Sequence, residues 1–358
     1  MTKRPNSKES EIKSKEIPTD LSNALPEDEI SSPNGDVSSV QDLGTDFNFK
    51  RKIVWSNVVV FLILHILGFI GLIEMLTLSV SILTNIYNIF LGVIGGIGIT
   101  MGAHRLFTHR SFKAKPPLRR ILMILFVLNG QNPLWEWARD HRQHHKYSDT
   151  DADPHNASRG FFFSHVGWLM SKKHPKVIEL GKGIDMSDLE ADSWIMFQKK
   201  YLIPIYGLVS IVIPTIIPVL LWNEDLIKSF LVCYVTRTVI VLNCTWCVNS
   251  VTHMYGTRPY DKTVLAVQND YVSAFSFGEG YHNYHHAFPW DYRASEFGPQ
   301  NGIVQTLIEY CAKKGWAYDL RSPTEESVKN RVQRKGDNSH YKYGGSNNYD
   351  ECETRKNL

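Results

Sequence analysis

The sequence predicts an all-α integral membrane protein with four transmembrane helices and a cytosolic helical cap. The prediction rests on four apolar segments of about 20 residues each, the length that crosses the hydrocarbon core of a bilayer as a helix. It rests also on the uneven distribution of Lys and Arg between these segments. The mean hydropathy of the 358-residue chain is only −0.21, because long polar stretches flank the apolar segments.

The four expected spans are residues 53–73, 80–102, 202–222 and 226–248. A basic run, 50–52, directly precedes the first span, and sixteen Lys and Arg residues lie between residues 103 and 200. The connectors 74–79 and 223–225 contain no Lys or Arg. Because cytosolic loops of membrane proteins are enriched in these residues, we expect both termini and the long central region to face the cytosol.

The rest of the chain divides into two tails and a folded region. The first 46 residues contain no Phe, Trp or Tyr, and such a segment buries too little apolar surface to offset the entropy of ordering. We therefore expect residues 1–47 to be a disordered polar tail, without the apolar core of a cleavable signal peptide. Residues 48–320 are expected to form the membrane domain with its cap, and residues 321–358 a polar C-terminal tail.

Composition excludes two classes of protein. A net charge of +3 provides no pronounced basic surface, so nucleic acid is not an expected partner. The 5 cysteines show no regular spacing of the kind found in disulfide-rich secreted scaffolds. The apolar segment 118–128 is too short to cross a bilayer, and we expect it to lie at the interface or beneath the cap.

Two features lie within the fourth span. Arg237 stands near its middle, where a guanidinium costs about 2.5–3.5 kcal/mol; we expect it to face the bundle interior and to have a partner there. Cys244 and Cys247 form a CxxC, but with no second pair and in an apolar segment a metal or redox role is not expected.

Histidine clusters are the most unusual feature of the sequence, which contains 14 histidines. His104 and His109 follow the second span, HxxHH occurs at both 141–145 and 282–286, and His253 follows the fourth span. Neutral imidazole is a ligand for Zn, Cu, Fe and Ni. One tetrahedral zinc takes only four ligands, so nine clustered imidazoles predict a histidine-rich dinuclear metal site at the cytosolic face.

Helical geometry divides these histidines between two ions. At about 100° per residue, His141 and His145 lie about 40° apart, and His144 lies about 60° to the other side of His141. Neighbouring histidines of one cluster can therefore serve different ions. His104 and His109 lie about 140° apart on a regular helix, so either the helix end is distorted or one of the two binds the second ion.

Several carboxylates lie close in sequence to the histidine clusters. Candidate carboxylates that orient metal-bound imidazoles are Glu136, Asp140, Asp149, Asp151, Asp153 and Glu279. Histidines without partners at ligand spacing, expected to be structural, are His65, His155, His165, His174 and His340. Soluble ferritin-like di-iron proteins use two Glu-x-x-His strings, whereas this chain has one, 279–282.

With these motifs, the chain resembles the membrane acyl-CoA desaturases of the stearoyl-CoA (delta-9) type, from about residue 49 to residue 318. The matching segments are GAHRLFTH (102–109), EWARDHRQHH (136–145), DADPHNASRGFFFSHVGW (151–168), NCTWCVNSVTH (243–253) and GEGYHNYHH (278–286). The resemblance implies a dinuclear iron centre held by His104, His109, His141, His144, His145, His253, His282, His285 and His286. It also implies that Asn249 reaches one iron through water.

The resemblance further implies a fatty acyl-CoA substrate. The positions that match CoA contacts are Arg139, Lys172 and Lys173. The positions that match the bend of the acyl tunnel are Gln131, Trp137, Thr245 and Trp246. Mammalian members cap the far end of the tunnel with a bulky residue, whereas the matching position here is Gly92, with Gly96 one turn on. We therefore expect a deeper tunnel that accepts longer chains; the alternative is helix packing at small residues.

The implied reaction is the O2-dependent insertion of a cis double bond, at delta-9, into a saturated fatty acyl-CoA. Iron with O2 provides an oxidant for an unactivated methylene, which acid–base catalysis does not. The chain contains neither a haem-attachment CxxCH nor a Rossmann GxGxxG. The two further electrons are therefore expected from separate proteins, which the resemblance implies are cytochrome b5 and NADH-cytochrome b5 reductase, in the endoplasmic reticulum membrane.

Two other functions remain open from the residues. One is another histidine-box oxygenase, such as an acyl-lipid or sphingolipid desaturase or a hydroxylase. The other is a membrane metal transporter, but transport sites lie near the bilayer midplane, whereas these histidines gather at one face.

Overall fold

The computed structural model describes residues 43–297 and 302–344, so the expectations for residues 1–42 and 345–358 lie outside the described residues. The described chain is mostly helical, and it contains four helices long and apolar enough to cross a membrane. These are Trp55–Leu76, Ile82–Thr108, Leu202–Trp222 and Leu226–His253. The predicted fold class is confirmed. The second and fourth helices continue past their expected ends, and the added residues include His104 and His253.

The first membrane helix, α2 (Trp55–Leu76), packs on the π-helix η5 (Phe230–Thr236) and on α12 (Arg237–Ser250). Close packing depends on Gly68 and Gly71, because a Cβ at either position would collide with Val239 or Thr236. The hydroxyl of Thr236 donates a hydrogen bond of 3.0 Å to the carbonyl oxygen of Gly68. Small residues in this way bring the backbones of two membrane helices together.

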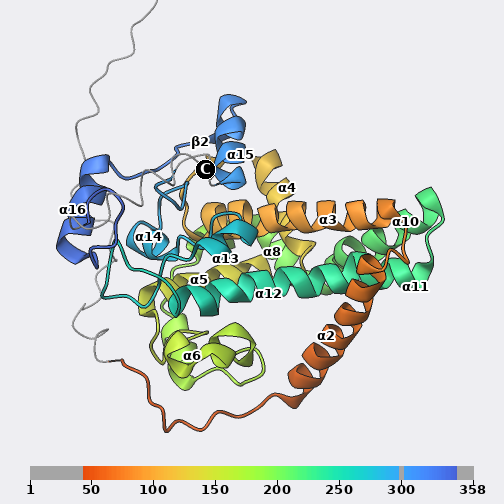
Figure 1. Ribbon diagram of the computed structural model, residues 1–358, viewed down its shortest axis with the longest axis horizontal. Helices are drawn as coiled ribbons and strands as arrows, with labels where there is room; N and C mark the ends of the chain where they lie inside the picture. The colour runs from red at the N-terminus through yellow and green to blue at the C-terminus, as the bar shows by residue number, and fades with distance from the viewer. Residues whose placement is uncertain (1–42, 298–301, 345–358) are drawn as a thin grey trace, which may run out of the picture. The chain divides into compact units, whose positions relative to one another are not determined.

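The second membrane helix begins as α3 (Ile82–Ile97) and continues as the π-helix η1 (Gly98–Thr108). It lies beside α12 and contacts α4 (Pro116–Val127), as Figure 1 shows for α3 and its neighbours. Helix α4 is the short apolar segment expected at the interface. One face of it is buried at Leu122 and Phe126, whereas Ile121 and Ile124 are half exposed, which suits a helix between the cap and lipid.

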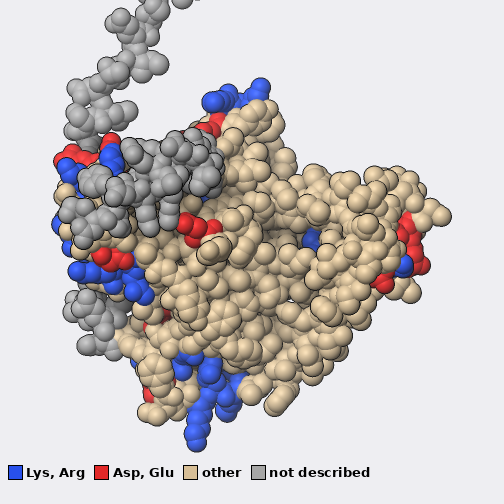
Figure 2. Space-filling model, viewed as in Figure 1, with Lys and Arg blue, Asp and Glu red and all other residues tan. Residues whose placement is uncertain are grey.

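The third and fourth membrane helices are each interrupted by π-helical turns. The third consists of α9 (Leu202–Tyr206), η4 (Gly207–Val212) and α10 (Ile213–Trp222), and the fourth of α11 (Leu226–Ser229), η5, α12 and the short 3-10 helix η6 (Val251–His253). Asn223 ends α10 in the left-handed conformation, with φ of 58°. The face drawn in Figure 2 is almost free of charge over α3 and α12, as expected of a lipid-facing surface.

The cap consists of short helices around the ends of the membrane helices. They are α5 (Leu134–Tyr147), η2 (Ala157–Arg159), η3 (Phe163–Gly167), α6 (Pro175–Gly181), α7 (Ser187–Glu190), α8 (Ser193–Lys200), α13 (Asp270–Phe275), α14 (His282–Ala287) and α15 (Ile303–Lys313). A short antiparallel pair joins β1 (Lys113–Ala114) to β2 (Ala317–Tyr318). The largest apolar core joins η1, α4, α5 and α15 through Phe107, Phe126, Leu134 and Ile308.

The described part of the C-terminal segment is folded onto the cap, where only a polar tail was expected. Helix α16 (Glu325–Lys335) buries Val328 and Val332 in a cluster with Tyr260, Tyr284 and Phe288. Two valines four residues apart give a narrow apolar stripe on an otherwise charged helix. Because the segment is otherwise highly polar, its composition did not predict that these two valines would pack on the cap.

Candidate metal centre

The structure gathers the nine clustered histidines into two adjacent groups. They come from η1 and its C-terminus, from α5, from the end of η6 and from α14. The first group is His104, His109, His141, His145 and His285, and the second is His144, His253, His282 and His286. Each histidine offers one ring nitrogen to its group, and within each group these nitrogens lie within 4.8 Å of one another. With five imidazoles in one group and four in the other, each group has enough ligands to bind one metal ion.

The π-helix η1 aims His104 and His109 at the same group. In a π-helix the repeating hydrogen bond joins residues i and i+5, and the backbone N–H of His109 donates to the carbonyl of His104 at 3.1 Å. Their ring centroids lie 4.9 Å apart. Of the two alternatives left open by the spacing, the structure therefore adopts the distorted helix end.

Helix α5 sends neighbouring histidines to different groups. His141 and His145 belong to the first group and His144 to the second. The same division occurs on α14, where His285 belongs to the first group and His286 to the second. This is the arrangement expected from the angles between successive side chains of a helix.

The distances between imidazole nitrogens within a group match those expected for ligands that bind the same metal ion. In the first group, Nε2 of His285 lies 3.0 Å from Nε2 of His104 and 2.9 Å from that of His145. In the second group, Nε2 of His286 lies 3.2 Å from that of His282 and 3.3 Å from that of His144. Two imidazole ligands at about 2.1 Å from one ion and 90° apart lie about 3.0 Å from each other. The donor set therefore fits two metal ions.

Burial favours the neutral form of three imidazoles of the first group. Burial, followed by the charges of neighbouring histidines, lowers the pKa of His109, His141 and His145 well below the usual value. Nε2 of His109 and of His141 is buried without a hydrogen-bond partner. A neutral imidazole with a free nitrogen is the form that binds metal.

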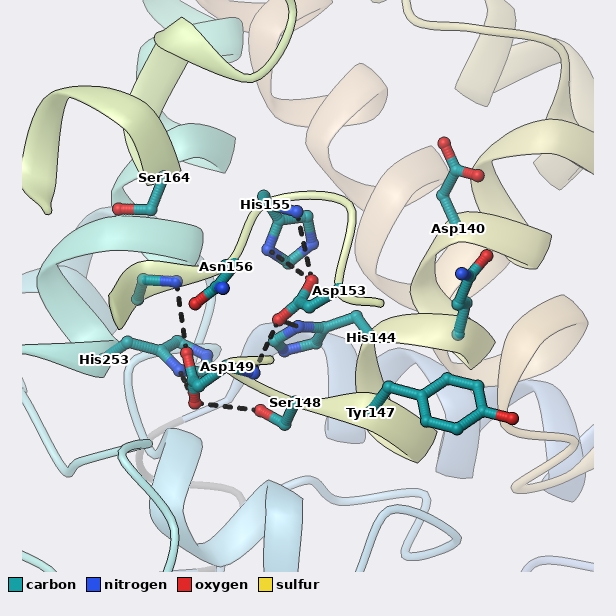
Figure 3. Close-up of polar contacts among 12 residues, drawn as sticks. Asp140, His144, Tyr147, Ser148, Asp149, Asp153, His155, Asn156, Ser164 and His253 are labelled. Atoms are coloured by element: carbon teal, nitrogen blue, oxygen red, sulfur yellow. Dashed lines mark hydrogen bonds and ion pairs between the residues drawn. The ribbon is translucent and has the colours of Figure 1, made fainter. Parts of the chain in front are cut away.

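Three carboxylates lie on the outer nitrogens of the imidazoles. Oδ2 of Asp153 lies 2.8 Å from Nδ1 of His144, and Oδ2 of Asp149 lies 3.1 Å from Nδ1 of His253 (Figure 3). An oxygen of Glu279 lies 3.0 Å from Nδ1 of His104. A carboxylate at Nδ1 fixes the ring orientation and leaves Nε2 for the metal.

The other three candidate carboxylates do not contact the nine imidazoles in this way. Asp140 binds Arg139 and Lys173 at 2.8 and 2.6 Å, and Asp151 binds Arg159 at 2.5 Å. The side chain of Glu136 forms no hydrogen bond or ion pair among the described residues.

One histidine that was expected to be only structural lies against the centre. The ring centroids of His155 and His144 lie 4.3 Å apart, with the ring planes tilted by 38°. His155, Asp153 and His144 form a third compact group of possible ligand atoms. The spacing of single histidines gave no indication of this contact. The only signal was its position two residues after Asp153.

An apolar cavity of about 290 Å³ leads from the centre into the membrane region. Its lining includes His104, His141 and His282 near the centre and Gly92 and Arg237 farther along. A second cavity, of about 140 Å³, lies on the cap side. Both cavities are lined by Trp137, His141, Thr245 and Asn249.

Three polar side chains form a bridge where the cavities meet. The indole of Trp137 donates to Oε1 of Gln131 at 2.7 Å, and the amide of Gln131 donates to the hydroxyl of Thr245 at 3.2 Å. Trp246 lines the cap-side cavity from the fourth membrane helix. The residues expected at the tunnel bend therefore lie close together, although they come from two distant segments: Gln131 and Thr245 are 114 residues apart in the sequence.

The expected CoA residues lie in the cap. Arg139 and Lys173 both bind the carboxylate of Asp140, and Lys172 and Lys173 line a small cleft with Arg51 and Arg159. Asp140 is thus the common partner of Arg139 and Lys173, and Lys172 lies beside Lys173 in the lining of the cleft.

Comparison with known proteins agrees with the site. Residues 79–318 match the fatty acid desaturase family. The chain is 52% identical over 297 residues to an acyl-CoA Delta-9 desaturase of Acheta domesticus, covering 83% of this chain and 82% of that protein. It is 50% identical to an acyl-CoA Delta(11) desaturase of Spodoptera littoralis, with 80% and 85% covered. Stearoyl-CoA desaturase 4 of Mus musculus is 46% identical, with 81% and 82% covered.

These relatives act on acyl-CoA and differ in the position of the double bond, so their similarity establishes the class of reaction and the class of substrate. With the four membrane helices and the two histidine groups, the matches show that the chain is a multi-pass membrane protein of the fatty acid desaturase family, an acyl-CoA desaturase.

Proposed function

We propose that the protein inserts a cis double bond at delta-9 into a saturated fatty acyl-CoA, using O2 and a di-iron centre. The observation that carries this proposal is the apolar cavity that reaches two histidine groups. Bound there, iron would supply the oxidising power, derived from O2, that removes two hydrogens from an unactivated chain. The nine histidines would hold the two irons, and Asn249, which lines both cavities, would reach one of them through water.

The protein's own residues position the chain. Trp137, Gln131 and Thr245 define the place where an acyl chain passes from the cap-side cavity to the membrane-side cavity, next to His141. A chain held there presents a fixed pair of carbons to the centre, and the apolar lining excludes water. Arg139, Lys172 and Lys173 bind the phosphates of CoA, for which cationic side chains are suited.

The two remaining electrons come from cytochrome b5 and its NADH-dependent reductase, at the cytosolic face of the endoplasmic reticulum, with both termini cytosolic. Delta-9 specificity is favoured by the Acheta domesticus relative, although a Delta(11) relative is almost as similar. Gly92 leaves the far part of the cavity open, so chains longer than C16 are accepted.

Expression in a yeast strain without its own acyl-CoA desaturase tests the proposal. We expect growth without added unsaturated fatty acid, and mass spectrometry of the cellular fatty acids should find cis-delta-9 products of C18 or longer. Growth with delta-11 or delta-12 products would replace the proposed position. Anaerobic cultures should form no product, whereas product without O2 would contradict the proposed chemistry.

A further inference from the structure

Arg237 is a buried cation within a membrane helix and lines the apolar cavity that leads from the histidine groups into the membrane region. Only 2% of its surface is exposed, and among the described residues that line the cavity it is the one Lys or Arg. Figure 2 shows blue, basic atoms in a hollow of the otherwise uncharged surface over α3 and α12. An ionisable group at this depth costs free energy, and such residues usually serve a pathway or a binding site.

Arg237 is only partly satisfied by the protein. Its Nη2 donates to the carbonyl oxygen and the hydroxyl of Ser210, at 2.9 and 3.2 Å, which meets the expectation of a partner in the bundle. Its Nε and Nη1 are buried with no hydrogen-bond partner. Among the described residues no carboxylate forms an ion pair with it. Two donor nitrogens of a buried cation are thus left for something the cavity contains.

Asn88 offers the complementary group on the opposite helix. It lies on α3, is 4% exposed and lines the same cavity. Its Nδ2 contacts the sulfur of Met75 at 3.3 Å, whereas its Oδ1 is buried without a partner. The far part of the cavity therefore presents unused donors from Arg237 and an unused acceptor from Asn88.

Gly92 makes this polar end accessible from the apolar part. It lies one turn after Asn88 on α3, and a Cβ built at Gly92 meets no atom within 4 Å. Because glycine has no side chain, this position does not block the path from the apolar part of the cavity to Arg237.

We propose that Arg237 and Asn88 form a polar terminal subsite that takes an oxygen atom able both to accept and to donate a hydrogen bond. The hydroxyl of an ω-hydroxyacyl chain has this chemistry, and water takes the same place when the chain is shorter. A methyl end that reaches the subsite displaces this oxygen and leaves the buried groups unpaired. A hydrogen-bonding site rejects an analogue that lacks the polar group, so the subsite limits methyl-ended chains and favours ω-hydroxylated ones of equal length.

This inference rests on the proposed acyl-CoA desaturation. The test is competition between matched acyl-CoAs, methyl-ended and ω-hydroxylated, from C16 to C22, with the purified full-length protein, cytochrome b5 and its reductase. We expect the ratio of ω-hydroxylated to methyl-ended product to exceed one from the length at which the chain reaches Arg237. Arg237→Met and Asn88→Leu should each reduce that ratio about 10- to 100-fold, the effect of losing one hydrogen bond to a charged group or one buried acceptor.

Asn85→Leu is the matched control. Its Oδ1 is also buried and unpartnered, but Asn85 does not line the cavity, so the ratio should stay unchanged. A ratio of one or less at every length, or one that neither Arg237→Met nor Asn88→Leu changes, would overturn the inference.

Absence of any desaturation would instead reject the proposed function. Thermal stabilisation by stearoyl-CoA and by 18-hydroxystearoyl-CoA then decides the inference separately. Greater stabilisation by the hydroxylated chain, lost in Asn88→Leu, supports the subsite, and equal stabilisation contradicts it.

Discussion

Asp153 holds His144 by its outer nitrogen, with Oδ2 2.8 Å from Nδ1, and both side chains are buried. The carboxylate also accepts hydrogen bonds from the backbone N–H groups of Asp149 and His155, at 2.8 and 3.0 Å. It is therefore fixed by the loop that follows α5, as Figure 3 shows, and it in turn fixes the ring of His144. Nε2 of that ring faces the other histidines of the second group and lies 3.3 Å from Nε2 of His286.

Replacing Asp153 should weaken metal binding more than folding. Asp153→Asn retains one acceptor oxygen but removes the charge at Nδ1 of His144, and loss of such a partner typically costs 10- to 100-fold in metal affinity. We expect that loss in a chelator titration followed by metal analysis. Asp151→Asn is the control, because Asp151 binds Arg159 instead. Equal chelator sensitivity of the two variants would argue against a role for Asp153 at the metal.

Substitutions of two histidines that are adjacent in sequence should each remove the metal ion of a different group. His145→Ala removes a nitrogen from the first group and His144→Ala one from the second. We expect each variant to lose desaturase activity while folding normally, and to retain about half of the bound iron, measured by elemental analysis of the purified protein. His340→Ala, which removes a ring bound to Glu296, should keep its full iron content. Full activity in His145→Ala would remove that residue from the ligand set.

The membrane fold could be predicted because length and hydropathy decide it. The helix Leu202–Trp222 has the predicted bounds. The π-helix η1 was less accessible: the spacing of His104 and His109 required a distortion or a division between ions, and only tertiary packing of η1 on α4 and α5 decides between them. Local sequence does not determine which turn of a helix widens.

Other parts of the site depend on contacts that a sequence does not display. Nothing in the spacing brings His155 to His144, because the loop between them folds back through Asp149 and Asp153. The unused donors of Arg237 are equally invisible in sequence, where only the charge within an apolar span could be noticed. The polar C-terminal segment, likewise, becomes a helix only because Tyr260 and Tyr284 receive its two valines.

The stability of the metal-free protein should fall as the pH falls below about 6.5. Burial holds the pKa of His141, His145 and His285 well below the usual 6.5, so the unfolded state binds more protons than the folded state in that range, and acid favours unfolding. Above about pH 7 both states are neutral at these rings and stability should not vary from this cause. The melting temperature of chelator-treated protein between pH 5.5 and 8 measures the effect.

His145→Ala combined with His285→Ala removes two of the titrating rings, so its melting temperature should depend less steeply on pH. A melting temperature that rises on acidification, in either protein, would contradict neutral buried imidazoles.

Gly92→Phe should shorten the acyl chains that the enzyme accepts. The position lines the cavity, and its Cβ meets no atom within 4 Å, so a larger side chain enters the cavity without displacing backbone. Gly96 is a poorer site for this change, because a Cβ there would collide with the ring of Phe277. We expect the product profile of Gly92→Phe, analysed by mass spectrometry, to move toward C16 and shorter, with a rate on C20 substrate at least 10-fold lower, since overpacking a filled site costs about 1–3 kcal/mol.

Gly207→Phe is the matched control: its Cβ is equally unobstructed, but Gly207 does not line the cavity, so the profile should stay that of the unmodified protein. If both variants shift the profile alike, helix packing and not cavity depth sets the chain length; if neither does, the far part of the cavity holds no acyl chain.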